Sequence, residues 1–318
     1  MRRYTPSILI FLITFIVLCI ALNIVSRRGL VDGLAIGHMR PVPDASIVVL
    51  DGPHYVEHAA LHHDVGGFID QARRADVLIL GNSRAQCGFD PRVLEDSATV
   101  GGPTFYNLAC GEGENIAFGR SLIERHDLRP ETVIVPIDHL VLDDEFTDTA
   151  SKAIASPRWT AFRSMLEGDA RWRLARRLHQ LLPRADWFQH PGLRNRWYIA
   201  RDVSTGSWRL LERPEGDHPA VADAPPGDVQ FDDERLADAR AFVESMNARD
   251  IDVVFTHVPS AIQSPRQAID AAAALDVPLI LVPGDELRTF DRSHLHPDSA
   301  RRFTESFVEQ LSALRDRP

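Results

Sequence analysis

From Ala75 onward, short aliphatic runs alternate with amphipathic stretches of helical length. Aliphatic and β-branched runs predict buried strands, and apolar residues spaced three and four apart predict helices that bury one face. Strands that alternate with helices form a parallel sheet covered on both faces, so we expect a three-layer α/β domain. The predicted strands are Val77–Leu80, Thr104–Leu108, Thr132–Ile137, Asp252–Thr256 and Pro278–Leu281, and the predicted helices span about 91–97, 113–127, 232–249, 266–275 and 299–314.

An insertion at about 143–230 interrupts this alternation between the third and fourth strands. Within it, residues 151–213 carry thirteen basic and five acidic side chains, and residues 169–182 read as an amphipathic helix. We expect a mostly helical lid and keep two interpretations of its basic face open. It is either simply solvated, or it binds an acidic polymer or anionic headgroups, because interleaved Trp and Arg suit both stacking and charge pairing. The insertion contains all five tryptophans: Trp159, Trp172, Trp187, Trp197 and Trp208.

The first segment of the chain predicts a membrane anchor. Ser7–Val25 is a run of nineteen uncharged residues, which as a helix spans about 28 Å, close to the thickness of the bilayer core. A cleavable signal peptide is the alternative, but the run is long and no small-x-small cleavage site follows it. We expect residues 1–28 to form a single-pass anchor in the cytoplasmic membrane, with residues 29–74 as a stalk that carries one peripheral strand at 46–50 and the α/β domain at 75–318.

Topology is only weakly indicated. Arg2 and Arg3 before the anchor are matched by Arg27 and Arg28 after it, so the positive-inside rule hardly decides. The usual arrangement for such an anchor leaves the short N-terminal tail in the cytoplasm. We therefore expect the soluble domain to face the periplasm or the cell exterior.

Net charge and cysteine content exclude some classes of partner and cofactor. A net charge of −10 disfavours nucleic acid as a partner. The three cysteines have no disulfide-scaffold or zinc-finger spacing. His62, His63 and Asp64 lack further ligands at zinc-like spacing, so we expect them to lie in a surface loop without a metal.

Ser83 and the distant pair Asp291 and His294 carry candidate chemistry. Ser83 follows the first predicted strand, where binding sites form in open parallel sheets. Asp291 and His294 lie three positions apart just before the last predicted helix. A serine hydroxyl becomes a nucleophile when an imidazole takes its proton and a carboxylate orients that imidazole. From position alone, Ser83 or Asn82 could equally be only the N-cap of the next helix.

The stretch "ILGNSR" at 79–84 resembles the Gly-Asp-Ser block of the SGNH (GDSL-like) hydrolase superfamily, and "DRSHL" at 291–295 resembles its closing Asp-x-x-His block. The similarity covers about 75–140 and 232–314. It implies a flavodoxin-like sheet and a triad of nucleophile Ser83, general base His294 and orienting acid Asp291, without a cofactor. His296 is a less suitable base, because no acidic residue lies three positions before it.

The resemblance also implies an oxyanion hole. The glycine of the second block corresponds to Gly111, whose backbone N–H would act with that of Ser83. The third block normally supplies an asparagine, but this chain has Asp138 and His139 at that place. An ionised carboxylate would oppose an oxyanion, so Asp138 is not a direct replacement, and Asn115 or a residue of the insertion is the candidate third donor.

The anchor, the insertion and the altered third block make the chain similar to membrane-anchored SGNH relatives that transfer or remove acyl groups on cell-envelope polymers. The resemblance implies an esterase or O-acyltransferase acting on acyl, most simply acetyl, esters of an extracytoplasmic polysaccharide, beside a multi-pass membrane acyltransferase. An inactive SGNH-fold protein that binds polysaccharide or docks on such a transferase is the alternative. A transmembrane scaffold, with the Ser83 and Asp291/His294 pairing a coincidence, is a third.

If the resemblance holds, Cys87 lies in the first turn after Ser83, and Cys110 precedes Gly111. The two thiols could then form a disulfide that braces the site, or remain two small buried cysteines.

Overall fold

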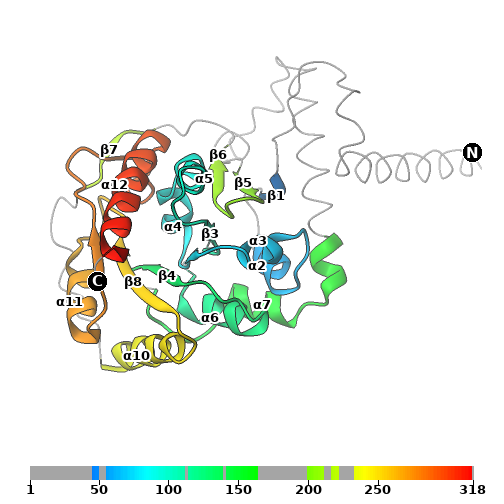
Figure 1. The fold of residues 1–318 in the computed structure, drawn as a ribbon. Helices are drawn as coiled ribbons and strands as arrows, with labels where there is room; N and C mark the ends of the chain where they lie inside the picture. Colours follow the sequence, from blue (N-terminus) through cyan, green and yellow to red (C-terminus); the bar gives the residue numbers. More distant parts are fainter. Residues whose placement is uncertain are drawn as a thin grey trace, which may run out of the picture. The chain divides into compact units, whose positions relative to one another are not determined.

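This computed structural model describes residues 45–49, 55–111, 114–138, 141–163, 199–210, 216–221 and 233–316. In this part of the chain, five parallel strands form the central sheet, around which the helices are arranged (Figure 1). The strand order, β3-β2-β4-β8-β9, is that of a flavodoxin-like sheet, in which the strand that comes first along the chain, here β2, lies second. All five lie where the aliphatic runs predict them. They are β2 (Val77–Ile79), β3 (Phe105–Asn107), β4 (Thr132–Pro136), β8 (Asp252–His257) and β9 (Leu279–Leu281).

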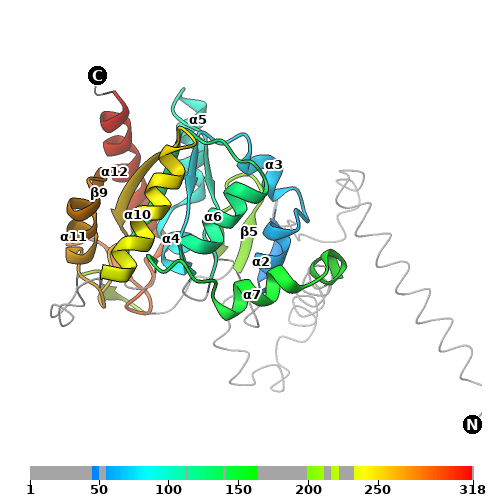
Figure 2. The same ribbon diagram turned by 90° about the horizontal axis from the view of Figure 1, so that it is seen from below.

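Helices cover both faces of this sheet, which confirms the predicted three layers (Figures 1 and 2). Successive strand residues point to opposite faces. Val77 and Ile79 join a core cluster with α4, α5 and α12, whereas Leu78 and Leu80 join a second cluster with α6, α10 and α11. The helices are α4 (Ser83–Gly88), α5 (Pro91–Thr99), α6 (Ile116–Arg125), α10 (Asp233–Asn247), α11 (Arg266–Leu275) and α12 (Pro297–Arg315).

The C-terminal helix α12 shows why the apolar spacing was informative. Phe303, Phe307 and Leu311, spaced four apart, are all buried. Phe89, at the end of α4, packs its ring edge-on against both phenylalanines, with ring centroids 5.4 Å and 5.1 Å away. The predicted buried face is therefore the face that joins α12 to the segment following Ser83.

Residues 55–72 are not part of a stalk, so the predicted domain boundary at residue 75 is wrong. They form α2 (Tyr55–His62) and α3 (Phe68–Ala72), which belong to the same compact unit as the sheet. Leu61 and Phe68 have no exposed surface and lie in the main core cluster. The sequence pattern hid α2 because three of its buried residues, Glu57, His58 and His62, are polar.

A three-stranded antiparallel sheet joins the N-terminal segment to the insertion. β1 (Ala45–Val49), the predicted peripheral strand, pairs with β5 (Ile199–Asp202), which pairs with β6 (Trp208–Leu210). The described part of the insertion thus contains helix α7 (Asp148–Ala155), further helical residues at 158–163 and the β5–β6 hairpin, a feature that the sequence pattern did not predict. Near the end of the insertion, β7 (His218–Pro219) pairs with β10 (Arg288–Thr289).

Two predictions concern segments that the structure does not describe. The anchor at Ser7–Val25 and the amphipathic helix at 169–182 both lie outside the described residues. Among the residues that are described, no helix combines the length and the apolar character needed to cross a membrane.

Candidate active site

Ser83 is the first residue of α4, at the carboxyl end of β2. Gly81 makes the turn between them with φ +116, a value that L side chains rarely adopt. Asn82 is the N-cap, because its side-chain oxygen accepts the backbone N–H of Arg84 at 3.0 Å. The cap role therefore falls to Asn82, and the Ser83 hydroxyl makes its contact elsewhere.

The structure brings Ser83, His294 and Asp291 together. Ser83 Oγ lies 2.8 Å from His294 Nε2, and His294 Nδ1 lies 2.7 Å from Asp291 Oδ2. The other carboxylate oxygen of Asp291 accepts the backbone N–H groups of Ser293 and His294 at 3.0 Å and 2.7 Å. The three side chains form one continuous hydrogen-bonded relay, although Ser83 and His294 are 211 positions apart.

The turn that carries Asp291 and His294 is fastened at both ends. Phe290 N–H donates to the His294 carbonyl at 3.0 Å, and Thr289 and Leu295 form an isolated bridge. The Phe290 ring stacks on the His294 imidazole, with centroids 5.7 Å apart and planes 17° apart. Because Phe290 and Leu295 are buried, they hold the imidazole at the surface of the core.

The electrostatics of Asp291 suit an orienting group. Partial burial alone would raise its pKa, but the hydrogen bond and charge of His294 outweigh this and lower the pKa below its ordinary value. The carboxylate is therefore ionised throughout the neutral range. An anion at Nδ1 favours the tautomer that leaves Nε2 ready to accept a proton from Ser83.

His296, the less suitable base, lies away from Ser83. Its Nε2 donates to the Gly216 carbonyl at 2.5 Å. Among the described residues, His294 is the histidine that contacts the serine.

Gly111 lies on the loop that follows β3, beside the turn that carries Ser83. β3 is the neighbour of β2, with Asn107 opposite Ile79. Beyond the strands the contact continues, because Leu108 N–H donates to the Ile79 carbonyl at 2.7 Å and Cys110 N–H to the Gly81 carbonyl at 3.0 Å. Cys110, the residue just before Gly111, is therefore hydrogen-bonded to the turn that leads into Ser83.

Asn115 has a structural role. Its side-chain oxygen accepts the Ala117 N–H at 3.1 Å and so caps α6, while its amide nitrogen donates to the Glu145 carbonyl at 2.7 Å. Both ends of the amide are used within the fold. The described contacts include no hydrogen bond between Asn115 and Ser83, so the role of Asn115 as an oxyanion donor stays a prediction.

Asp138, which stands where an asparagine was expected, is buried and accepts hydrogen bonds from Asn82, Arg84 and Val141. Oδ2 accepts from Asn82 Nδ2 at 2.6 Å and from Arg84 Nη1 at 3.1 Å, and Oδ1 accepts the Val141 N–H at 3.1 Å. Arg84 thus compensates the charge that would oppose an oxyanion. His139, its neighbour, lies outside the described residues.

Sequence reasoning missed Arg84, which connects several loops around the serine. Besides Asp138 it contacts Gln263 Oε1, and its Nε donates to Ser293 Oγ at 3.0 Å. These partners come from the segments after β4, after β8 and between Asp291 and His294. A buried carboxylate at 138 requires a nearby cation, and this was the signal that could have identified Arg84.

The neighbouring His257, the last residue of β8, is kept neutral. Burial lowers its pKa from 6.5 to about 4, and the charge of Arg84 acts in the same direction. Positive charge on this side of the site is therefore carried by Arg84 and not by His257.

Cys87 and Cys110 are free and buried, so the hypothesised disulfide is wrong. Burial raises the pKa of both thiols well above the ordinary value, which keeps them protonated. We expect both cysteines to react with a maleimide only after denaturation, and equally with and without prior reduction. Peptide mass mapping checks this, and a linked Cys87–Cys110 peptide pair would contradict the structure.

The residues first considered as metal ligands lie at and just after the end of α2. Arg125 donates to the His62 carbonyl at 2.9 Å, and the rings of His62 and His63 pack edge to face. Across the described ranges, no group of three or more His, Cys, Asp or Glu residues is placed to hold a metal ion.

Fold and site together define an α/β protein with a flavodoxin-like parallel sheet and a Ser-His-Asp relay at the carboxyl edge of that sheet. No family model and no curated protein matches the chain. Among solved structures it is similar to a crystal structure of a candidate acylhydrolase from Bacteroides fragilis, with 11% sequence identity and a TM-score of 0.34. That alignment covers 76% of this chain and 88% of the other.

Proposed function

We propose that the protein is an SGNH-type serine enzyme that makes or breaks acyl esters through a covalent acyl-enzyme. The observation that carries the proposal is the continuous relay of Ser83, His294 and Asp291, with distances of 2.8 Å and 2.7 Å. Distances in this range are those that a nucleophile and its general base require.

The proposed reaction has two halves. Ser83 Oγ attacks the ester carbonyl carbon as His294 Nε2 takes the hydroxyl proton, and Asp291 stabilises the imidazolium that forms. The tetrahedral intermediate collapses to an acyl-serine as the imidazolium returns the proton to the leaving alcohol. Water or a second hydroxyl, deprotonated by His294, then attacks the acyl-serine and releases the acid or a new ester.

Stabilisation of the oxyanion is assigned to the backbone N–H groups of Ser83 and Gly111. The contact between Cys110 N–H and the Gly81 carbonyl supports this, because it holds the Gly111 loop beside the Ser83 turn. Each such donor is typically worth about 10² to 10³ in rate. The salt bridge with Arg84 further keeps the Asp138 carboxylate from repelling the developing negative charge.

For the substrate we propose acyl, most simply acetyl, esters on a polysaccharide outside the cytoplasm. This rests on the predicted anchor at Ser7–Val25 and on the Arg- and Trp-rich insertion. In this proposal the anchor holds the enzyme at the cytoplasmic membrane beside a multi-pass acyltransferase. A hydroxyl of the polymer replaces water as acceptor when the reaction is a transfer.

Full-length protein purified in mild detergent tests the proposal. We expect it to release acetate from an acetylated sugar or an aryl acetate, and to be labelled at Ser83 by a serine-directed phosphonate. Labelling should disappear in His294→Gln, because the hydroxyl is then not activated. A wild type that neither releases acetate nor takes up the probe would overturn the enzyme proposal.

A second candidate function is supported by the altered third block. Asp138 replaces the expected asparagine, and the amide nitrogen of Asn115, the group that would donate to an oxyanion, already donates to the Glu145 carbonyl. An inactive SGNH-fold module that binds polysaccharide would retain binding to the acetylated polymer while remaining unlabelled. The phosphonate experiment therefore separates the two functions.

A further inference from the structure

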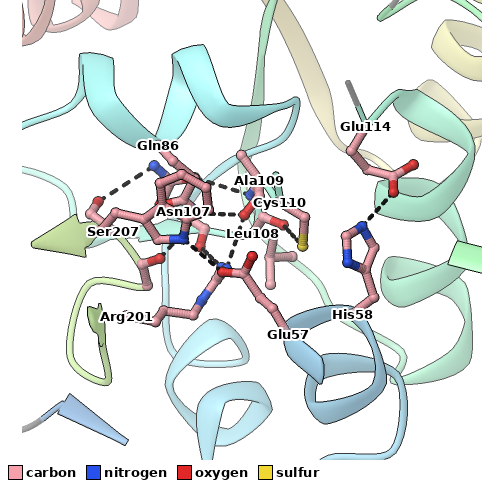
Figure 3. A network of polar contacts seen from close by, with 12 residues as sticks. Glu57, His58, Gln86, Asn107, Leu108, Ala109, Cys110, Glu114, Arg201 and Ser207 are labelled. Carbon is pink, nitrogen blue, oxygen red and sulfur yellow. Dashed lines mark hydrogen bonds and ion pairs between the residues drawn. The ribbon is translucent and has the colours of Figure 1, made fainter. Parts of the chain in front are cut away.

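Arg201 is a fully buried arginine whose partners include the main chain at the end of β3 (Figure 3). It projects from β5 of the insertion and has no exposed surface. Nη1 donates to the Ala109 carbonyl at 2.9 Å, and Nη2 donates to the Asn107 carbonyl. Its two terminal nitrogens thus bind alternate carbonyls of the segment that leads to Gly111.

The counter-ion of Arg201 is Glu57, which is also fully buried. One oxygen of Glu57 accepts from Arg201 Nη1 and, at 2.8 Å, from the indole N–H of Trp208. A buried ion pair often contributes less to stability than apolar residues of the same shape. Stability alone therefore does not explain the pair, whereas fixed donors for two main-chain carbonyls require a guanidinium.

The adjacent residue of α2 reaches the far side of the same segment. His58 Nε2 donates to Glu114 Oε2 at 2.5 Å, and both side chains are buried (Figure 3). Glu114 also accepts from the Thr147 hydroxyl at 3.1 Å. Two consecutive residues of α2 thus contact both sides of Gly111. Glu57 does so through Arg201, which binds the chain before Gly111, and His58 does so through Glu114, which follows it.

The hairpin turn and the nucleophile helix complete these contacts. Asn107 N–H donates to the Thr205 carbonyl at 2.7 Å. Gly206 packs so closely that a Cβ there would lie 2.2 Å from the Asn107 carbonyl oxygen. Gln86, three residues after Ser83 on α4, donates to the carbonyls of Ala109 and Gly206. The end of β3 is therefore joined to α2, to the insertion and to the helix of the nucleophile.

We propose that Glu57, His58 and Arg201 are positioning residues that hold the Gly111 loop in place for the reaction of Ser83. They act through the backbone, because Arg201 binds main-chain carbonyls before Gly111 and His58 binds Glu114 after it. The inference rests on the proposed function, in which the Gly111 N–H receives the oxyanion. It assigns a catalytic purpose to a helix and a hairpin outside the segments that resemble SGNH enzymes.

The first test removes both charges together in full-length protein, with Glu57→Gln and Arg201→Met. The introduced glutamine oxygen still accepts from Trp208, and no lone charge is left in the core. With an aryl acetate we expect kcat to fall about 10² to 10³-fold, the effect of losing one oxyanion donor, and KM to change less than about twofold because substrate binding is not altered. Phe242→Leu in α10, in the main core cluster, is the control for destabilisation and should keep the wild-type kcat.

The second test uses His58 and measures loop order directly. In His58→Gln the amide nitrogen can still donate to Glu114 from about the position of Nε2, so kcat should stay within about threefold of the wild-type value. In His58→Leu this donor is lost, and kcat should fall at least about tenfold. Amide hydrogen exchange of Leu108 and Cys110, which bond to the β2 side of the site, should accelerate at least about tenfold in His58→Leu and in the double variant. Exchange in α12 should stay unchanged.

Each outcome decides one of the two proposals. Folded variants with wild-type kcat, or with unchanged exchange at Leu108 and Cys110, overturn the positioning role. If the Glu57→Gln/Arg201→Met variant does not fold, the comparison of His58→Gln with His58→Leu tests the positioning role by itself. A wild type that is inert toward ester and probe overturns the proposed function and the catalytic consequence with it, and exchange then still shows whether these residues hold the loop.

Discussion

Ser83→Ala is expected to lower kcat/KM for an aryl acetate by about 10⁴ to 10⁶, because the residue supplies the nucleophile and forms the acyl-enzyme. Stability should hardly change, since the hydroxyl belongs to a half-buried residue and bonds to the partly exposed His294. Burst kinetics and intact-mass detection of an acetyl-enzyme in the wild type, absent from the variant, measure the effect.

Ser121→Ala is the matched control for Ser83→Ala. Ser121 lies in α6, and its hydroxyl donates to the Phe118 carbonyl at 2.7 Å. Its replacement should leave kcat/KM within about twofold, because such surface substitutions rarely change stability by more than about 0.5 kcal/mol. Equal rates for wild type and Ser83→Ala would remove Ser83 from the mechanism and attribute the hydrolysis to another group.

Asp291→Asn is expected to lower kcat by about 10⁴, the loss typical of a triad whose imidazole takes the wrong tautomer. The introduced amide can donate to Nδ1 of His294, which leaves the proton on Nε2, where it faces Ser83 Oγ. Geometry should change little, because asparagine retains an oxygen for the N–H groups of Ser293 and His294. Steady-state rates together with the rate of phosphonate labelling measure the loss.

Asp250→Asn is the matched control for Asp291→Asn. Asp250 adopts φ 59, a left-handed conformation that asparagine also tolerates, in the turn before β8. Its replacement should leave kcat unchanged.

Because the pKa of Asp291 is lowered in the folded protein, the acid limb of the wild-type pH–rate profile should not come from this carboxylate. An Asp291→Asn variant with more than about one tenth of the wild-type kcat would contradict the orienting role of the carboxylate.

The parts of the fold that were predictable depend on local pattern. Buried strands such as Val77–Ile79 consist of consecutive aliphatic residues, and α12 shows its buried face as phenylalanines four apart. The proximity of Ser83 and His294 was predictable as well, because loops after parallel strands meet at one edge of the sheet. Their hydrogen bond then required only that both side chains point into that edge.

The parts that were missed depend on polar residues that pair across long sequence separations. Glu57 and Arg201 read as surface residues because nothing local shows that each has a buried partner 144 positions away. Arg84 was missed for a related reason, because its partner Asp138 lies 54 positions away, although the carboxylate at 138 was itself a sign that a cation is near. Apolar periodicity fails in such places, since the energy of a buried charge is set by its partner and not by its neighbours in sequence.

The pairing of Glu57 with Arg201 makes the insertion impossible to remove as a module. A shortened chain that lacked the hairpin would leave the Glu57 carboxylate in the core with neither Arg201 nor Trp208 as a donor. The uncovered edge of β3 would also expose the Asn107 N–H that now pairs with Thr205. Loss of one partner of a buried ion pair typically costs about 3 to 5 kcal/mol. In any lineage that shed this segment, position 57 would have to become apolar first or at the same time, so the two regions are expected to change together.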